Sequence, residues 1–212
     1  MKNRKGFTLI ELLVVIAILA ILMSIVVVTL NPAEMLRKTR DTKRVSDLNS
    51  LMTALNLYIS DKARPDLDGS NACATDVWYS LSAVGPASVS QSPRVNPRVV
   101  AAANSYKVDS TGWIPVNFAS ISSGSPLSNL PMDPVNATST TAASNYYYTY
   151  ACNGTSSTFE LNAQMESTYY KANGDGDVVQ KDGGNDTTNK LYEVGSDLTL
   201  LGTPAVGFYQ WP

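Results

Sequence analysis

The sequence predicts an α+β protein in which a long N-terminal helical spine packs on a small antiparallel β-sheet. Three observations support this fold class: a nearly uninterrupted apolar run near the N-terminus, an amphipathic segment directly after it, and a composition of Ser, Thr, Asn, Gly and Pro with scattered aromatic residues beyond Asp66, which is typical of a β-rich domain with long loops. We therefore expect four segments: a leader at 1–6, a membrane-spanning helix at 7–30, an amphipathic helix at 31–64 that continues the spine, and a β-rich globular domain at 65–212.

The apolar run is long enough to cross a membrane. From Leu12 to Leu30 only Ser24 and Thr29 are polar, and about 20 helical residues span a hydrocarbon core of about 30 Å. A secretory signal has a shorter apolar region and a cleavage site of small residues, whereas Ala17 and Ala20 are followed here by Ile21 and Leu22. A membrane span is therefore favoured, with a simple anchor and a cleaved secretory signal as the alternatives.

A single carboxylate, Glu11, stands near the start of this run. An ionised side chain at mid-bilayer costs roughly 2.5 kcal/mol or more, so a carboxylate in such a place usually has a partner. The identity of that partner is the main functional question that the sequence raises.

The residues around Glu11 form a recognisable signal. A basic leader with Lys2, Arg4 and Lys5 runs into Gly6-Phe7-Thr8-Leu9-Ile10-Glu11. The stretch K-G-F-T-L-I-E-L-L at 5–13 resembles the class III signal of type IV pilins and type II secretion pseudopilins. The resemblance covers about the first 30 residues and implies cleavage by a prepilin peptidase after Gly6, N-methylation of Phe7, and a role for Glu11 in filament assembly.

Helical spacing makes these roles chemically reasonable. Cleavage after Gly6 would create a cationic amine on Phe7, and Glu11 follows it by four residues, which is about one turn on the same helix face. The carboxylate could pair with the amine of its own chain or with that of a neighbouring subunit. The resemblance favours the neighbour, with the pair setting the axial register of a filament; the intrachain pair is the alternative.

Composition excludes several function classes. The chain has a net charge of -2, no histidine and two cysteines, so histidine-based catalysis and the common zinc sites are ruled out. Loss of the three leader cations would bring the charge to about -5, which gives no reason to expect a nucleic-acid partner. We expect that the protein is not an enzyme.

The spine is expected to change direction at Asn31-Pro32 and to end at Arg64-Pro65, because proline lacks the N–H that a helix interior needs. A kink or a locally melted stretch is predicted at Pro32. The basic residues between Arg37 and Arg44 could bind lipid headgroups or nucleic acid, but a solvated helical face is favoured. Apolar residues then recur with helical spacing, a pattern that predicts docking on a sheet: Val45, Leu48, Leu51, Met52, Leu55, Tyr58 and Ile59.

The strongest strand signal is a hairpin. Residues 145–152 and 158–165 alternate in polarity around Asn153-Gly154, a dipeptide typical of hairpin turns. Glu160, Asn162 and Gln164 fall on one face of the second strand and are expected to point away from the core. Tyr146, Tyr148 and Tyr150 favour core packing over a binding platform. Further strands are predicted at 77–81 and 191–194 and near 198–201.

Two candidate sites lie in this domain. Cys73 and Cys152 would close a loop of about 80 residues, and a disulfide is plausible outside the cytoplasm, where it would contribute about 4 kcal/mol. The acidic stretch with Asp175, Asp177, Asp182 and Asp186 offers oxygen ligands for Ca²⁺. It departs from the EF-hand pattern, so a solvated loop without a cofactor is favoured.

The sequence therefore predicts a structural subunit of a type IV pilus-like filament. The resemblance implies a homo-oligomer held through N-terminal helices, with the prepilin peptidase and methyltransferase, the inner-membrane assembly platform and the membrane as further partners. It also implies a single-pass precursor with a cytoplasmic N-terminus, followed by an extracellular or periplasmic filament. A major pseudopilin of a type II secretion system shares the same signal. Less favoured are a ligand-binding or enzymatic ectodomain on a permanent anchor and a DNA-binding competence pilin.

Overall fold

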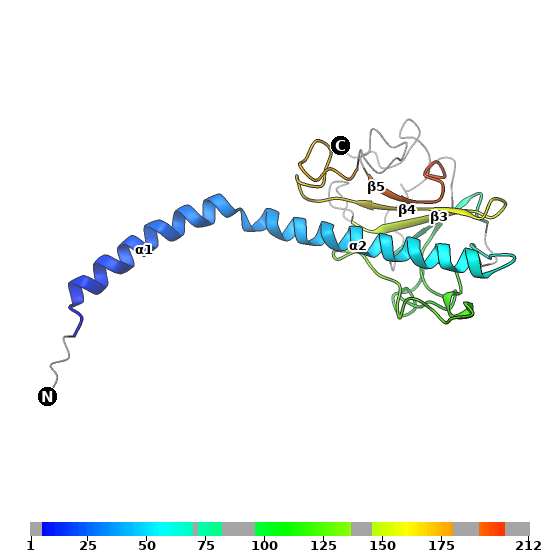
Figure 1. Ribbon diagram of the computed structural model, residues 1–212, viewed down its shortest axis with the longest axis horizontal. Helices are drawn as coiled ribbons and strands as arrows, with labels where there is room; N and C mark the ends of the chain where they lie inside the picture. The colour runs from blue at the N-terminus through cyan, green and yellow to red at the C-terminus, as the bar shows by residue number, and fades with distance from the viewer. Residues whose placement is uncertain (1–5, 70–71, 82–95, 137–145, 180–190, 202–212) are drawn as a thin grey trace.

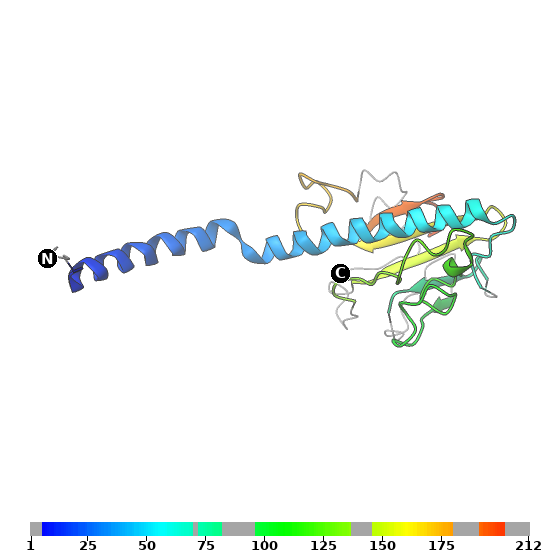
Figure 2. The same ribbon diagram turned by 60° about the horizontal axis from the view of Figure 1, so that its bottom comes forward.

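Two consecutive helices form a bent rod with a β-rich domain at its far end (Figures 1 and 2). The computed structural model describes residues 6–69, 72–81, 96–136, 146–179 and 191–201. Helix α1 spans Leu9–Leu30 and stands clear of the domain, and α2 spans Pro32–Asp61 and lies along the sheet. The predicted α+β class, a helical spine on a small sheet, is confirmed.

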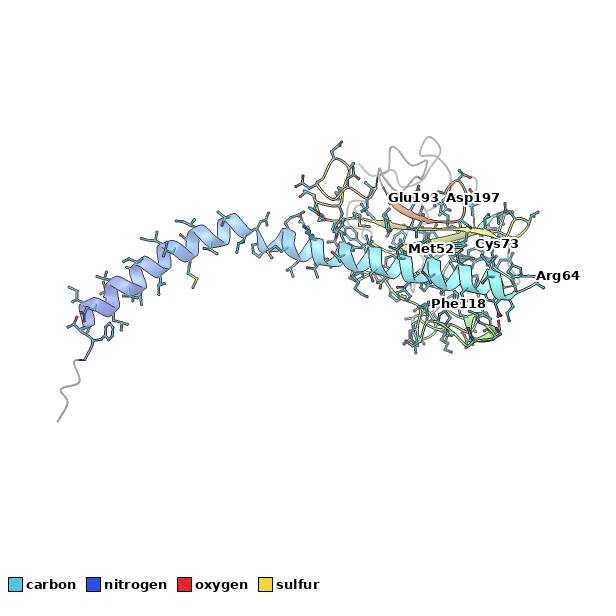
Figure 3. All side chains as sticks on the ribbon, viewed as in Figure 1. Met52, Arg64, Cys73, Phe118, Glu193 and Asp197 are labelled. Carbon is cyan, nitrogen blue, oxygen red and sulfur yellow. A yellow bond between two sulfur atoms is a disulfide. The ribbon has the colours of Figure 1, made fainter. Side chains whose placement is uncertain are left out.

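The two helices differ in what surrounds them. Helix α1 is apolar on every side, and its large side chains are exposed within the subunit, from Leu9 at 82% to Val14 and Leu19 at 48%. Figure 3 shows these side chains projecting in several directions with no other element beside them. Leu9–Val26 is long and apolar enough to cross a membrane. A helix with no polar face is typical of a lipid or helix-bundle environment, not of a surface helix.

The junction between the helices is sharp. Asn31 adopts a left-handed conformation (φ 40°, ψ 73°), ends α1 and at the same time caps α2, with its side-chain oxygen accepting the Glu34 N–H at 3.4 Å. Pro32 occupies the first turn of α2, where its missing N–H costs nothing. The predicted change of direction is therefore a kink between two capped helices, and the helix on either side is intact.

The sheet has five strands in the order β2-β1-β3-β4-β5. Their bounds are β1 Asp76–Tyr79, β2 Asn96–Arg98, β3 Tyr148–Asn153, β4 Thr158–Gln164 and β5 Leu191–Gly195. Strands β1, β3, β4 and β5 are antiparallel, as expected, and β2 adds a parallel edge to β1. The short β2 was not predicted, because Pro97 and its polar neighbours carry no strand signal.

The predicted hairpin is present, and a four-residue turn connects its strands. Cys152 pairs with Phe159 and Asn153 with Thr158, so four residues, Gly154 to Ser157, connect the strands. Asn153 belongs to the ladder, and its side-chain oxygen accepts the N–H groups of Thr155 and Ser156. The turn expected around Asn153-Gly154 therefore begins one residue later, at Gly154, and the side-chain cap of Asn153 holds it.

The main core lies between α2, the inner face of the sheet and the segment 105–132. Helix α2 buries the predicted stripe, with Leu48, Leu51 and Leu55 all at 0% exposure. Strands β3 to β5 present alternate residues to it, including Tyr148, Tyr150 and Phe159. In Figure 1 the green segment covers α2 on the side away from β3–β5. Its core residues are Trp113, Ile114, Val116, Phe118, Ile121 and Leu130.

The outer face of the sheet is also covered, which the alternating pattern of β4 did not predict. A second apolar cluster packs there: Val77, Tyr79, Leu81, Tyr147, Ala151, Leu191, Leu200 and Leu201. Glu160 and Asn162, expected to face away from the core, are 0% and 2% exposed. Residues 198–201, predicted as a strand, form a turn whose leucines cover this face instead.

Candidate functional site

The predicted cleavage position, Gly6, lies just before α1 in exposed, non-helical chain. A methyl group placed on Gly6 would meet no atom within 4 Å. The fold of the subunit therefore does not require glycine here.

Glu11 forms a capping box at the start of α1. Its Oε2 atom accepts both the backbone N–H and the hydroxyl of Thr8 at 2.8 Å, and the Glu11 N–H donates to Thr8 Oγ1 at 3.3 Å. Such reciprocal bonds satisfy helix-end donors that would otherwise lack a partner. The carboxylate is thus held at the N-terminal end of α1 by the residue two places after the cleavage position.

The surroundings of Glu11 are apolar and open. A shallow hollow beside it is lined by Phe7, Ile10, Val14 and Val15. Phe7 is 86% exposed and Ile10 70% exposed. A carboxylate at the edge of an exposed apolar helix can accept a cation from a second molecule without disturbing any contact within the chain.

The basic residues of α2 are engaged within the subunit. Arg44 is fully buried and binds Asp41, Asp133 and Glu166 with N···O distances of 2.7, 2.6 and 2.6 Å. Arg40 donates to the same Glu166 at 2.8 Å. We call these five residues the charge clamp. The expectation of a solvated face is wrong for Arg44, and the clamp leaves this guanidinium inaccessible to lipid or nucleic acid.

Backbone groups complete the charge clamp. The carboxylate of Asp41 accepts the N–H groups of Glu166 and Ser167 at 2.9 and 2.7 Å, and Asp133 accepts the N–H of Val135 at 2.8 Å. Burial raises the pKa of Glu166, but hydrogen bonds and charges from Arg40 and Arg44 outweigh it, so the net shift is downward from 4.5. The clamp thus ties the start of α2 to the segments that precede β3 and follow β4.

Sequence reasoning missed the charge clamp, although one signal was available. Asp41 and Arg44 continue the buried stripe of α2 at helical spacing from Leu48, and opposite charges three residues apart on a buried face are adjacent on the helix. Their partners lie far along the chain: Asp133 follows Arg44 by 89 residues, and Glu166 follows Asp41 by 125 residues. No local pattern connects residues so far apart.

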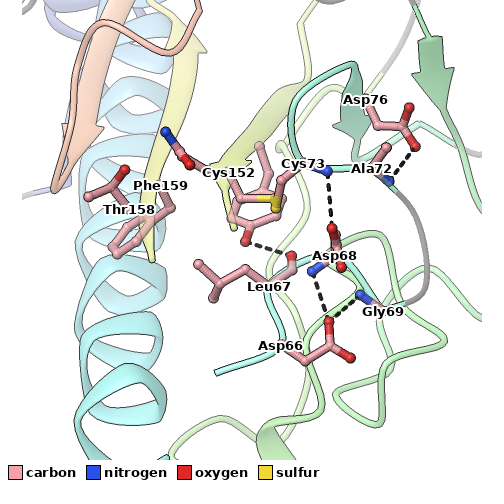
Figure 4. The surroundings of a disulfide bond; sticks show 12 residues. Asp66, Leu67, Asp68, Gly69, Ala72, Cys73, Asp76, Cys152, Thr158 and Phe159 are labelled. Atoms are coloured by element: carbon pink, nitrogen blue, oxygen red, sulfur yellow. Dashed lines mark hydrogen bonds between the residues drawn. A yellow bond between two sulfur atoms is a disulfide. The ribbon is translucent and has the colours of Figure 1, made fainter. Parts of the chain in front are cut away.

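Cys73 and Cys152 form a disulfide across 79 residues (Figure 4). The bond joins the segment after α2 to the end of β3, and both cysteines are buried, at 5% and 0% exposure. Next to it, the Tyr150 hydroxyl donates to the Leu67 carbonyl at 2.9 Å. The bridge therefore closes the end of the domain that lies farthest from α1.

The described residues of the acidic stretch are not arranged as a group of Ca²⁺ ligands. Asp177 is 6% exposed and accepts the N–H groups of Asn173 and Val179, so it serves the local turn. Asp175 is exposed, and Asp182 and Asp186 lie outside the described residues. Within the ranges that the structure describes, no three Asp, Glu, Cys or His side chains gather as a metal-binding group.

Comparison with known proteins places the beginning of the chain. Residues 1–27 match the family described as the prokaryotic N-terminal methylation motif. This confirms the recognition of a prepilin-type signal, and it marks the chain as a type IV pilin-like or pseudopilin substrate with an apolar N-terminal helix. No curated protein and no solved structure shows a significant match.

Proposed function

We propose that this protein is the structural subunit of a type IV pilus-like filament, cleaved after Gly6, methylated on Phe7 and polymerised through α1. The observation that carries the proposal is that α1 exposes apolar side chains on all sides and has one carboxylate, Glu11, at its very start. Burying such a helix among identical helices removes this surface from water or lipid without any change in the docked domain.

Glu11 supplies the specificity in this proposal. The capping box occupies its Oε2 atom, and the Oε1 atom is left to accept the N-terminal amine of a neighbouring subunit. Both charges are costly in an apolar bundle unless they meet. A pair between chains would therefore fix how far one subunit is shifted along the axis relative to the next.

The proposal also assigns the surroundings of the protein. The precursor would sit in the membrane through α1, with the leader in the cytoplasm and the β-rich domain outside. The prepilin peptidase and methyltransferase would process it, and an inner-membrane platform would assemble it. Because the signal is common to both classes, a major pseudopilin of a type II secretion system is the second candidate, and filament length by electron microscopy separates the two.

The test is the intact mass and N-terminal residue of the protein isolated from its membranes and from sheared filaments. We expect a chain that begins at Phe7 and carries one additional methyl group. A chain that still begins at Met1, or one cut beyond Leu30, would refute the proposal and favour a ligand-binding ectodomain on a permanent anchor or a secreted domain.

Two variants separate processing from assembly. Gly6→Val should block cleavage while leaving the domain folded, since the added side chain meets nothing in the subunit. Glu11→Gln should be cleaved normally but should fail to enter filaments. Ser24→Ala is the matched control, because the Ser24 hydroxyl donates to the Ile21 carbonyl of its own helix, and it should assemble like the wild type.

A further inference from the structure

The apolar exterior of α1 continues past the kink into the start of α2. Met35 and Leu36 are 57% and 61% exposed, and the first buried residue of α2 is Asp41. These exposed apolar side chains end where two cations, Arg37 and Lys38, follow in the sequence. Long basic side chains beside the end of a membrane span reach into the headgroup layer, so the change from apolar to basic marks the edge of the apolar surface.

The loop that follows β4 lies beside this part of α2. It is the gold segment at the end of the domain nearest α1 in both views (Figures 1 and 2). Thr168 Oγ1 donates to Glu34 Oε1 at 2.8 Å, and Lys38 Nζ lies 3.3 Å from the centroid of the Tyr169 ring. The rings of Tyr169 and Tyr170 meet edge to face with centroids 4.9 Å apart. These contacts hold two aromatic rings at the end of the domain that faces α1.

The exposed charges at this end are mainly positive. Arg37, Lys38 and Lys171 are exposed. Glu34 is offset by Arg37 at 3.6 Å, which leaves Lys38 and Lys171 against Asp175, the exposed carboxylate in the described part of the loop. We call this surface the proximal patch; its members are Met35, Leu36, Arg37, Lys38, Tyr169 and Lys171.

The proximal patch lies at the depth of lipid headgroups when α1 spans a membrane. The 22 residues of α1 measure about 33 Å, close to the hydrocarbon thickness of about 30 Å. Lys38 follows Leu30 by eight residues, or about 12 Å along a helix. The headgroup layer adds about 5–8 Å on each side of the hydrocarbon, and charges act over a Debye length of about 10 Å. The cations are therefore within reach of headgroup phosphates.

We propose that the proximal patch binds anionic lipid headgroups on the membrane surface nearest the domain, before the subunit enters a filament. Basic residues next to a membrane span are attracted to anionic lipids, and tyrosine is enriched at the level of the headgroups. Met35 and Leu36 then meet the boundary of the hydrocarbon. A second copy of the chain pairing through the same face would instead bring like charges together.

This proposal rests on the proposed function, because it requires α1 in the membrane. It adds a restraint that α1 cannot supply. The direction of α1 relative to the domain is set at one junction, Asn31-Pro32. Headgroup contact on one side of that junction would limit how the domain tilts, and the contact would be released when the subunit leaves the membrane.

The test is hydrogen–deuterium exchange of the full-length precursor in lipid nanodiscs. Peptides from the loop after β4 should exchange about fivefold more slowly in discs with about 30% phosphatidylglycerol than in discs of phosphatidylcholine. The difference should disappear in about 0.5 M NaCl, where the Debye length is roughly 4 Å. Equal exchange in the two kinds of disc would overturn the headgroup proposal alone. A precursor that enters neither disc would refute the membrane-inserted state, and both proposals with it.

The same experiment distinguishes lipid from a second copy of the chain. Discs are loaded with one or with several subunits at a fixed lipid composition. Protection that depends on phosphatidylglycerol and not on the number of subunits supports the proposal. Protection that rises with the number of subunits in phosphatidylcholine discs would assign the proximal patch to contacts between subunits and overturn the proposal.

Variants of α2 locate the lipid contact. The double variant Arg37→Gln/Lys38→Gln should lose most of the difference between the two kinds of disc. Lys43→Gln is the matched control, because Lys43 is exposed on the same helix but lies about 20 Å beyond Leu30, past the headgroup layer. It should keep the full difference.

A purely structural role for Lys38 is separated by comparing the two lipids. Loss of its contact with Tyr169 would change exchange equally in both kinds of disc, whereas loss of headgroup binding changes only the difference between them. Lys171→Gln, which leaves that contact in place, should also reduce the difference. A double variant that keeps the full difference, or a Lys43→Gln variant that loses it, would overturn the proposal.

Discussion

At the scale of single residues, two charged side chains, Glu11 and Arg44, are held by specific partners. Glu11 is capped by Thr8 at the start of an otherwise apolar helix, and Arg44 is buried among three carboxylates. Arg44 lies where water cannot compensate its charge, and each of the two side chains is held by specific partners. The Thr8 cap leaves one oxygen of Glu11 able to bind another molecule, whereas the three carboxylates around buried Arg44 leave it inaccessible to one.

Replacing Arg44 should test the charge clamp. In Arg44→Met the packing volume is nearly kept, but three buried carboxylates lose their common cation, and removal of one partner of a buried ion pair costs about 3–5 kcal/mol. Lys43→Met is the control, because Lys43 is exposed and pairs with Asp47 one helical turn away; its cost should be about 0–1 kcal/mol. Urea denaturation of both variants measures the difference, and equal stabilities would contradict a closed clamp.

The charge clamp also predicts how stability responds to acid. The pKa of Glu166 is lowered below 4.5 in the folded protein, so its ionised form contributes stability at and above that pH. The contribution is lost as the pH falls below about 4.5 and through the folded-state pKa. We expect the gap in unfolding free energy between wild type and Glu166→Gln to shrink between pH 6 and pH 3, as measured by denaturation at each pH. A constant gap would show that the charge of Glu166 is unimportant.

At the scale of elements, the kink between α1 and α2 separates two helices with different surroundings. Helix α1 exposes apolar residues throughout, and α2 docks its stripe on the sheet. Asn31 and Pro32 end one helix and start the next within two residues. The direction in which α1 leaves the domain is therefore set locally and not by packing.

Replacing Pro32 should straighten the spine. Pro32→Ala restores a backbone N–H that can donate across the junction, and it removes the steric restriction that proline places on Asn31. Spin labels attached to cysteines that replace exposed Ser24 and Ser46 should then move apart, as measured by pulsed electron paramagnetic resonance. A label pair at Ser46 and Ser60, both on α2, should keep its distance. An unchanged distance across the junction would mean that the left-handed Asn31 alone maintains the kink.

At the scale of the whole molecule, long-range links join segments that the chain keeps far apart. The disulfide closes one end of the domain, and the charge clamp closes the end nearest α1. Between them, Trp113 and Phe118 from a segment with little regular structure fill the core beneath α2. The domain is thus tied at both ends of the docked helix.

Removing the disulfide should weaken the whole domain. A bridge across 79 residues restricts the unfolded chain by about 4 kcal/mol on the loop-entropy model. The double variant Cys73→Ala/Cys152→Ala should therefore unfold at clearly lower urea than the wild type, and it should be insensitive to reductant. A stability equal to that of the oxidised wild type would show that the bridge adds nothing to the packing of this end.

The local sequence determined the elements whose cause is local. The apolar run, the Asn31-Pro32 break, the stripe of α2 and the hairpin strands follow from spacing and backbone restrictions, and the motif around Gly6 and Glu11 is contiguous. Tertiary structure alone decided the rest. It buried Glu160 and Asn162 on a face that alternation assigned to solvent, because Leu200 and Leu201 return to cover it. It also paired Arg44 with Asp133 and Glu166, since contacts between distant segments form through the shape of the folded chain and leave no periodic trace in its sequence.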